Sequence, residues 1–144
     1  MPEITLCAAV SSIQCAIQFL REQLGERHSD FGAHVELAAE ELLVNVASYA
    51  YADDASKESG KIVFGCRWVN MDGCDQFCLW VRDWGHSFDP FRGVETPDIS
   101  LPVEERDVGG LGVHLIKHIS SHYIYSGSDG SNTVELYFKP VAAR

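Results

Sequence analysis

The chain has 144 residues, 46% of them apolar, which suits one domain spanning residues 1–144 with a core of ordinary size. Its net charge is −10, from 11 basic and 21 acidic residues, and no window concentrates lysine and arginine. This balance argues against binding of a phosphate backbone, so we expect no nucleic-acid partner. An acidic chain still binds an anionic nucleotide where Mg2+ and oriented backbone N–H groups supply a local positive field.

The N-terminus lacks the basic and apolar regions of a secretory signal, and no apolar run is long enough to cross a bilayer. We therefore expect a cytoplasmic protein with no membrane contact. The cysteines are odd in number and lack Cys-x-x-Cys spacing, which predicts reduced thiols rather than disulfides or a zinc site. They are Cys7, Cys15, Cys66, Cys74 and Cys78.

The first predicted elements are a short strand and an amphipathic helix. Residues 4–9 form a short apolar run that we expect at the edge of a sheet. Ser11 or Ser12 can cap the helix that follows, and Gly25 suits the position after its last turn. The helix is expected to bury an aliphatic stripe made of Ile13, Ile17, Leu20 and Leu24. Residues 28–32 are predicted to be a connector.

The stretch over residues 35–51, VELAAEELLVNVASYAY, predicts a core helix. Its apolar residues recur at three- and four-residue intervals: Ala38, Ala39, Leu42, Leu43, Val46, Ala47 and Ala50. Glu41, Asn45 and Ser48 form a narrow polar stripe on this apolar helix. Burial of an unpartnered carboxylate or amide is costly, so protein groups or a ligand must meet the stripe. The acidic and small residues 53–60 then indicate an exposed loop.

Two alternating runs follow, over residues 61–69 and 76–83. The Asp72-Gly73 pair between them predicts a β-hairpin, and we expect these strands in the centre of the sheet. Residues 94–110 are rich in Pro, Asp, Glu and Gly. A connection of this length inside a compact domain is usually functional and is often a lid.

The C-terminal part predicts a helix over residues 111–120 and a second hairpin formed by residues 122–126 and 133–138. The order strand, helix, helix, two strands, helix, two strands indicates an α+β fold. We expect a two-layer sandwich in which helices cover one face of a mostly antiparallel sheet. Aromatic residues of the strands are expected to pack on the sheet: Phe77, Trp80, Tyr125, Tyr137 and Phe138.

Three separated segments carry residues suited to hold a nucleoside triphosphate. Asp83 ends a predicted strand, where its carboxylate can accept the exocyclic N–H of adenine, and Gly85 lets the backbone pass close to the base. Asn45 offers an amide oxygen to Mg2+, and Glu41, one turn earlier, can take a proton from an attacking hydroxyl or water. Phosphate is favoured at a helix N-terminus, where the chain has Gly109, Gly110 and Gly112.

Each segment also has an ordinary structural explanation: a solvated helix edge, a strand-end turn, or a plain loop-to-helix junction. Their joint occurrence in this order makes coincidence the weaker explanation. No Walker motif is present, and the glycines lie too late in the chain for a dinucleotide fold. His114, His118 and His122 repeat every four residues without a carboxylate in register, which favours solvated histidines over a metal site.

The three motifs resemble the N, G1 and G2 boxes of the GHKL superfamily of ATPases and kinases. They read ExxxN on a helix, DxGxxFDP after a strand and GGLG at a loop–helix junction. The FDP and the ending ELLVNVASYAY are most similar to the small bacterial branch of anti-sigma-factor serine/threonine kinases. The resemblance covers about residues 36–119 and extends, through the terminal strands, to the Bergerat fold.

The resemblance implies an ATP–Mg2+ site, with Glu41 as the general base and Asn45 as the metal ligand. It also implies an ATP lid over residues 92–109, in which Arg106 contacts phosphate. Tyr49 stands where many members of this branch carry histidine. The residues that the resemblance assigns to nucleotide binding are Asn45, Tyr49, Asp83, Gly85, Phe88, Arg106, Gly109, Gly110, Leu111 and Gly112.

Members of this branch typically bind a sigma factor, phosphorylate a serine or threonine of a STAS-type antagonist, and form homodimers. The first hypothesis is therefore an ATP-dependent serine/threonine kinase that also sequesters a regulatory partner. The second is a binding module that uses ATP only as a structural or regulatory ligand. A histidine-kinase catalytic domain is less favoured, because the residues after Asn45 lack that branch's basic position and no phosphoacceptor helix precedes them.

Overall fold

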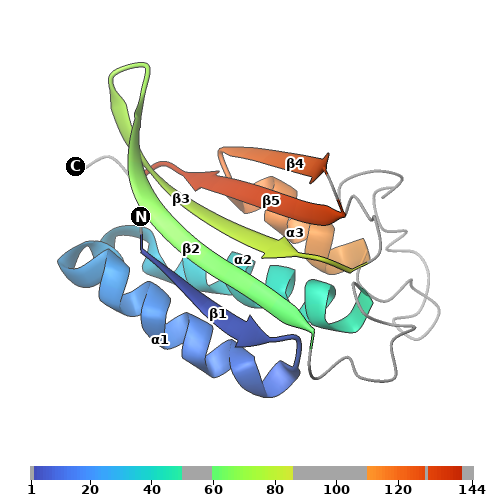
Figure 1. Ribbon diagram of the computed structural model, residues 1–144. Helices are drawn as coiled ribbons and strands as arrows, with labels where there is room; N and C mark the ends of the chain where they lie inside the picture. Colours follow the sequence, from blue (N-terminus) through green and yellow to red (C-terminus); the bar gives the residue numbers. More distant parts are fainter. Residues whose placement is uncertain (1, 50–59, 86–109, 129, 141–144) are drawn as a thin grey trace, which may run out of the picture.

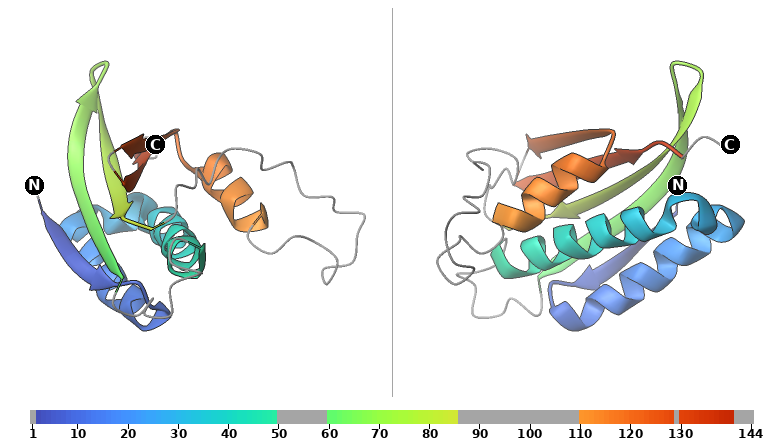
Figure 2. Two further views of the ribbon diagram at one scale, coloured as in Figure 1. Left: turned by 45° about the vertical axis from the view of Figure 1, so that its right-hand side comes forward. Right: turned by 180° about the vertical axis from the view of Figure 1, so that it is seen from behind.

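The computed structural model describes residues 2–49, 60–85, 110–128 and 130–140 (Figure 1). Its strands form one antiparallel sheet in the order β1-β2-β3-β5-β4, and the helices cover one face of that sheet (Figures 1 and 2). The strands are β1 (Glu3–Cys7), β2 (Lys61–Met71), β3 (Cys74–Asp83), β4 (His122–Ser128) and β5 (Ser131–Phe138). The helices are α1 (Ile13–Leu24), α2 (His28–Tyr49) and α3 (Gly110–Ile119). The predicted two-layer α+β sandwich is confirmed.

Helix α1 buries the stripe that its sequence predicts. The side chains that face the core are Ile13, Ala16, Ile17, Leu20 and Leu24. Gly25 follows the helix with a positive φ of 54°, and its N–H donates to the carbonyl of Arg21. The predicted serine cap is wrong, because the chain enters α1 through a 3-10 turn (Val10–Ser12) and the Ser12 side chain makes no capping hydrogen bond.

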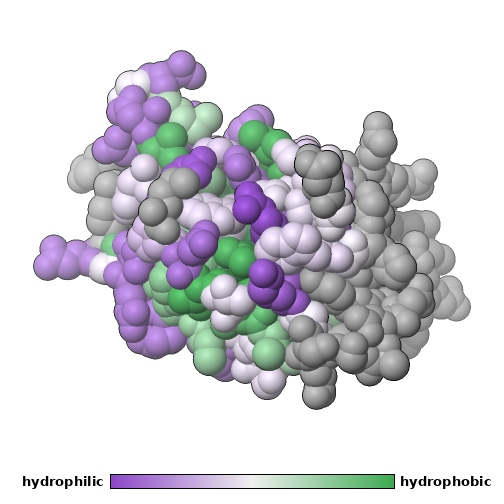
Figure 3. Space-filling view, in the orientation of Figure 1, coloured by the Kyte–Doolittle hydropathy of each residue, from purple (hydrophilic) through white to green (hydrophobic). Residues whose placement is uncertain are grey.

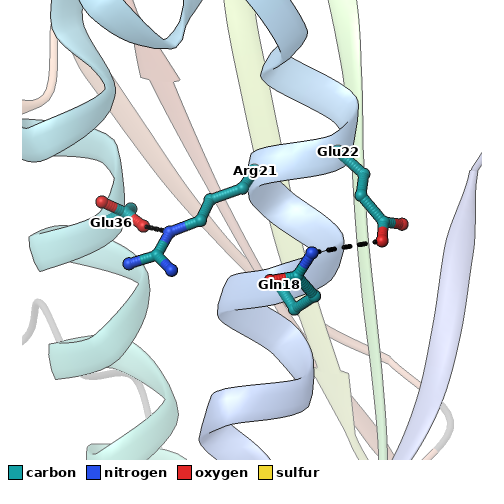
Figure 4. A network of polar contacts seen from close by, with 4 residues as sticks. All are labelled: Gln18, Arg21, Glu22 and Glu36. Carbon is teal, nitrogen blue, oxygen red and sulfur yellow. Dashed lines mark hydrogen bonds and ion pairs between the residues drawn. The ribbon is translucent and has the colours of Figure 1, made fainter.

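The predicted connector over residues 28–32 is also wrong, because α2 already begins at His28. A 3-10 turn (Gly25–Arg27) makes the whole corner between the two helices, so no further connecting residues are needed. Figure 4 shows Arg21 reaching from α1 to Glu36 on α2, where its Nε donates to the carboxylate. This partly exposed ion pair joins two helices that apolar packing already holds together, so it adds little to their stability.

Both hairpins form where they are predicted. Asp72 and Gly73 both have positive φ, 53° and 79°, which is the conformation of a two-residue type I′ turn. The second hairpin joins β4 and β5, and Gly130 in its turn has a φ of 80°. The pairing of β2 with β3 extends two residues beyond each predicted strand, as far as the pair of Met71 and Cys74.

The core lies between the sheet and the helices. Its largest fully buried side chains from the strands are Phe64, Phe77, Leu79, Val81 and Leu136, and those from the helices are Leu20, Val35, Leu42 and Ile116. All five cysteines are free thiols, as predicted. No helix among the described residues is long and apolar enough to cross a membrane.

A groove runs between the edge strand β1 and helix α1. It has a volume of about 570 Å3, and Ile4, Leu6 and Phe19 supply its apolar lining. Figure 3 shows an apolar area over β1 and the adjoining part of β2, bordered by hydrophilic side chains. The groove contains no residue of the three motif segments, so it is separate from the site described below.

On the face of the sheet away from the helices, the Trp80 ring lies over Gly65, its partner on β2. A Cβ at position 65 would come within 2.1 Å of this ring. The Arg67 guanidinium lies 5.4 Å from the centre of the same ring. Glycine at position 65 is therefore required for the indole to pack flat on the sheet, with only 6% of Trp80 exposed.

Gly65→Ala is expected to lower the free energy of unfolding by about 1–3 kcal/mol, because the added methyl group overlaps the Trp80 ring. Urea unfolding measures the loss. The same substitution in a Trp80→Val background is the control, since without the ring the alanine should cost much less. An equal cost in both backgrounds would show that the ring is not the reason for glycine at this position.

Candidate functional site

The three motif segments meet at one end of the molecule. The C-terminal end of α2, the end of β3 and the N-terminal end of α3 lie together there (Figures 1 and 2). Helix α2 packs against both β3 and α3, which keeps these ends side by side. Segments separated by up to about seventy residues of sequence thus reach the same region, as a common site requires.

Asp83 is the last residue of β3 and is only 5% exposed. Its register partner on β5 is Asn132, which is also buried. Asn132 Nδ2 donates to Asp83 Oδ1 at 3.0 Å, and the Gly85 N–H donates to the same oxygen at 2.9 Å. The carboxylate is thus held by two donors on one oxygen, at a place where the strand leaves the sheet.

Burial is the dominant influence on the Asp83 carboxyl group. It raises the pKa of Asp83 above the ordinary value of 3.8, and the hydrogen bonds from Asn132 and Gly85 partly offset this rise. A carboxylate in such a place is a strong hydrogen-bond acceptor, because water does not compete fully for it. The chemistry of this position suits recognition of an N–H group rather than binding of an anion.

On α2, Glu41 and Asn45 are four residues apart and therefore lie on one side of the helix. Asn45 is buried, with 9% exposed, whereas Glu41 is half-buried. Within the polar stripe predicted from the sequence, the Asn45 amide is thus buried and the Glu41 carboxylate is more accessible to solvent. An amide oxygen inside and a carboxylate nearer to solvent fit a metal ligand and a proton acceptor, respectively.

Several predicted site residues lie outside the described part of the chain. These are Phe88, Arg106 and Gly109, together with the whole predicted lid over residues 92–109. Gly110, Leu111 and Gly112 form the first turn of α3, and Tyr49 is the last residue of α2, but the structure describes only their backbone. The prediction that a helix begins at these glycines is therefore confirmed.

Trp84 and the histidines are at the surface. Trp84 follows Asp83 directly and is 41% exposed, with Lys61 Nζ 4.4 Å from the centre of its ring. His114, His118 and His122 are exposed, in agreement with the solvated histidines predicted. Among the residues that the structure describes, no group of three His, Cys, Asp or Glu side chains is placed to hold a metal ion.

Asn132 is a buried polar residue beside Asp83 that sequence analysis did not single out. It lies on the same, inward side of β5 as Val134, Leu136 and Phe138, so its inward position follows from the two-residue period of the strand. An amide at an inward position needs a partner, and this need is the signal that could have identified it. What the sequence could not supply is the identity of the partner, because that depends on the register between β3 and β5.

Comparison with known proteins gives one family and a recurring fold. The family described as histidine kinase-like ATPase domain matches residues 6–138. No curated protein matches the chain. The structure resembles the crystal structure of the RsbU and RsbW domains of Rv1364c from Mycobacterium tuberculosis, with a TM-score of 0.61 and 20% identity over 97% of this chain. This chain covers 33% of that one.

A second similar structure is the histidine kinase domain of the blue-light activated histidine kinase EL346 from Erythrobacter litoralis. It has a TM-score of 0.49 and 15% identity, and the alignment covers 91% of this chain and 60% of that one. The chain therefore spans between a third and three fifths of the solved structures that it resembles. The likeness to the Rv1364c structure confirms the expected Bergerat-type arrangement of sheet and helices.

Proposed function

Since the chain belongs to the histidine kinase-like ATPase domain family, we propose that it is an ATP-dependent serine/threonine protein kinase of the anti-sigma-factor type. The observation that supports this most is the pairing of Glu41 with Asn45 on one side of the C-terminal half of α2. The end of this helix lies beside the end of β3, where Asp83 is the last residue (Figure 1). A module that only binds nucleotide needs the amide and the Asp83 carboxylate. It has no need of a second, more accessible carboxylate one turn away.

In the proposed site, Asp83 and Gly85 would hold adenine, and Asn45 Oδ1 would hold the Mg2+ ion. The backbone N–H groups at the start of α3, from Gly110 onward, would bind the phosphates. The other residues proposed to bind the nucleotide are Tyr49, Phe88, Arg106, Gly109, Leu111 and Gly112. The residues described here fit such a ligand, because Asp83 offers a buried acceptor and Asn45 a buried hard oxygen ligand.

ATP would supply the transferable phosphoryl group, and Mg2+ would neutralise part of the charge on the phosphates. The task left to the protein is positioning and proton transfer. We assign proton transfer to Glu41, whose carboxylate accepts the proton of the attacking serine or threonine hydroxyl. Its half-buried position keeps it accessible to an acceptor hydroxyl that a partner protein brings to the site.

Glu41→Gln is expected to lower the rate of phosphoryl transfer by about 100-fold or more while leaving ATP affinity nearly unchanged, because only the proton acceptor is lost. Transfer from radiolabelled ATP to a small STAS-type protein measures the rate. Glu40→Gln is the matched control, since it makes the same change on the adjacent, exposed position of α2. Equal transfer by the Glu41 variant and the unaltered protein would remove Glu41 from this role.

The same experiment separates the two hypotheses about function. A kinase transfers phosphate to the serine or threonine of the antagonist, whereas a regulatory binding module binds ATP and transfers none. The proposed partners are a sigma factor and a STAS-type antagonist, and the proposed assembly is a homodimer. The solved structure that combines RsbU and RsbW domains supports a place in such a signalling system.

A further inference from the structure

A chain of polar contacts leads from β4 through β5 to Asp83. The Tyr125 hydroxyl donates to Asn132 Oδ1 at 2.6 Å, and Asn132 Nδ2 donates to Asp83 Oδ1 at 3.0 Å. We propose that Tyr125 and Asn132 are positioning residues that orient the Asp83 carboxylate to accept the 6-amino group of adenine, and so set the preference for adenine over purines without that group. This inference rests on the proposed function, because it concerns the same nucleotide site.

The contacts of the Asn132 amide fix which of its ends faces Asp83. Its nitrogen faces the carboxylate, which only accepts hydrogen bonds, and its oxygen accepts from the Tyr125 hydroxyl on the other side. The same nitrogen lies 3.4 Å from the Gly85 carbonyl, which is also an acceptor. A flipped amide would set its oxygen against both a carboxylate and a carbonyl. The two acceptors thus exclude the flipped amide, and the Tyr125 hydroxyl holds the remaining orientation by donating to Asn132 Oδ1.

The contacts also divide the two oxygens of Asp83 by role. Among the described residues, both hydrogen bonds to this carboxylate end on Oδ1, one from Asn132 and one from the Gly85 N–H. Oδ2 is then the oxygen assigned to a ligand N–H. Because the group is only 5% exposed, its direction is set by the protein and not by solvent. A carboxylate fixed in this way binds an amino group without first losing rotational freedom.

Gly127 makes room for the tyrosine. It is the register partner of Asn132 on β4, and it lies two residues from Tyr125 on the same side of the strand. A Cβ at position 127 would lie 2.7 Å from the Tyr125 hydroxyl oxygen and 3.3 Å from the carbon that bears it. The tyrosine can therefore lie along the strand and reach Asn132 only because position 127 has no side chain.

The test compares the affinity for ATP with that for purine riboside triphosphate, which lacks the 6-amino group. Unaltered protein should prefer ATP, and Tyr125→Phe should reduce this preference by roughly fivefold to tenfold while changing the affinity for the analogue little. Gly127→Ala should act in the same direction, because it displaces the hydroxyl without removing it. A general loss of structure would weaken both ligands alike, so the ratio of affinities separates positioning from damage.

Tyr123→Phe is the matched control, since it removes a hydroxyl from the same side of β4 outside this chain of contacts. Its ratio should equal that of the unaltered protein. If the unaltered protein prefers ATP and both the Tyr125 and Gly127 variants keep that preference, the positioning role is overturned and the proposed function stands. If the unaltered protein binds neither nucleotide, the proposed function itself fails.

Discussion

Asp83→Asn is expected to abolish measurable ATP binding, with a loss of affinity of about 100-fold or more, while the fold is retained. The amide has the shape of the carboxylate, and its oxygen can still accept from Asn132 and from the Gly85 N–H. Its nitrogen then replaces the ligand-facing oxygen, so a donor meets the amino group of adenine. Isothermal titration calorimetry measures the loss. ATP binding of unchanged strength would exclude the adenine contact assigned to Asp83.

The same variant should be more stable relative to the unaltered protein at pH 7 than at pH 3. Burial raises the pKa of Asp83 above 3.8, so the folded chain holds this proton more tightly than the unfolded chain. The ionised group therefore costs stability as pH rises from the ordinary pKa through the raised one, and asparagine removes this cost. Urea unfolding at the two pH values tests the sign. A variant that loses more stability at pH 7 would show that the two hydrogen bonds outweigh burial.

The sequence predicts those features that depend on the local pattern of residues. The buried stripe of α1, the core side of α2 and both hairpin turns follow from apolar period and from residues such as Asp72 and Gly73 that tolerate positive φ. Asp83 could be singled out because it ends a strand beside Gly85. Helix boundaries are less well determined, since α2 begins before its apolar pattern does and a 3-10 turn replaces the expected connector.

The features that the sequence does not predict depend on register between strands. Asn132 meets Asp83, Gly127 lies opposite Asn132, and Trp80 lies over Gly65 only because β2, β3, β5 and β4 pair as they do. A shift of one residue in any of these pairs would send the side chains to opposite faces of the sheet. Sequence patterns therefore locate the proposed ligand-binding residues, whereas the residues that orient them become visible only in the folded sheet.

Leu42→Ala is expected to lower the free energy of unfolding by about 3 kcal/mol, because Leu42 is fully buried between α2 and the sheet. The substitution leaves a cavity on the core side of α2, the helix that also carries Glu41 and Asn45. Urea unfolding measures the cost. Leu37→Ala is the matched control on the same helix, where the leucine is 39% exposed, and it should cost less than about 1 kcal/mol. Equal costs would contradict the assignment of Leu42 to the core.

Nucleotide binding connects this loss of stability to the proposed site. A ligand that binds only the folded state at 100 times its Kd raises the free energy of unfolding by about 2.7 kcal/mol. Mg2+ and ATP are added at 100 times the Kd of the unaltered protein. They should raise the free energy of unfolding of the unaltered protein by this amount, and that of Leu42→Ala by less. The reason is that the cavity loosens the helix that carries Glu41 and Asn45. Leu37→Ala should keep the full increment. A full increment in both variants would mean that the proposed Mg2+–ATP site does not depend on how α2 packs in the core.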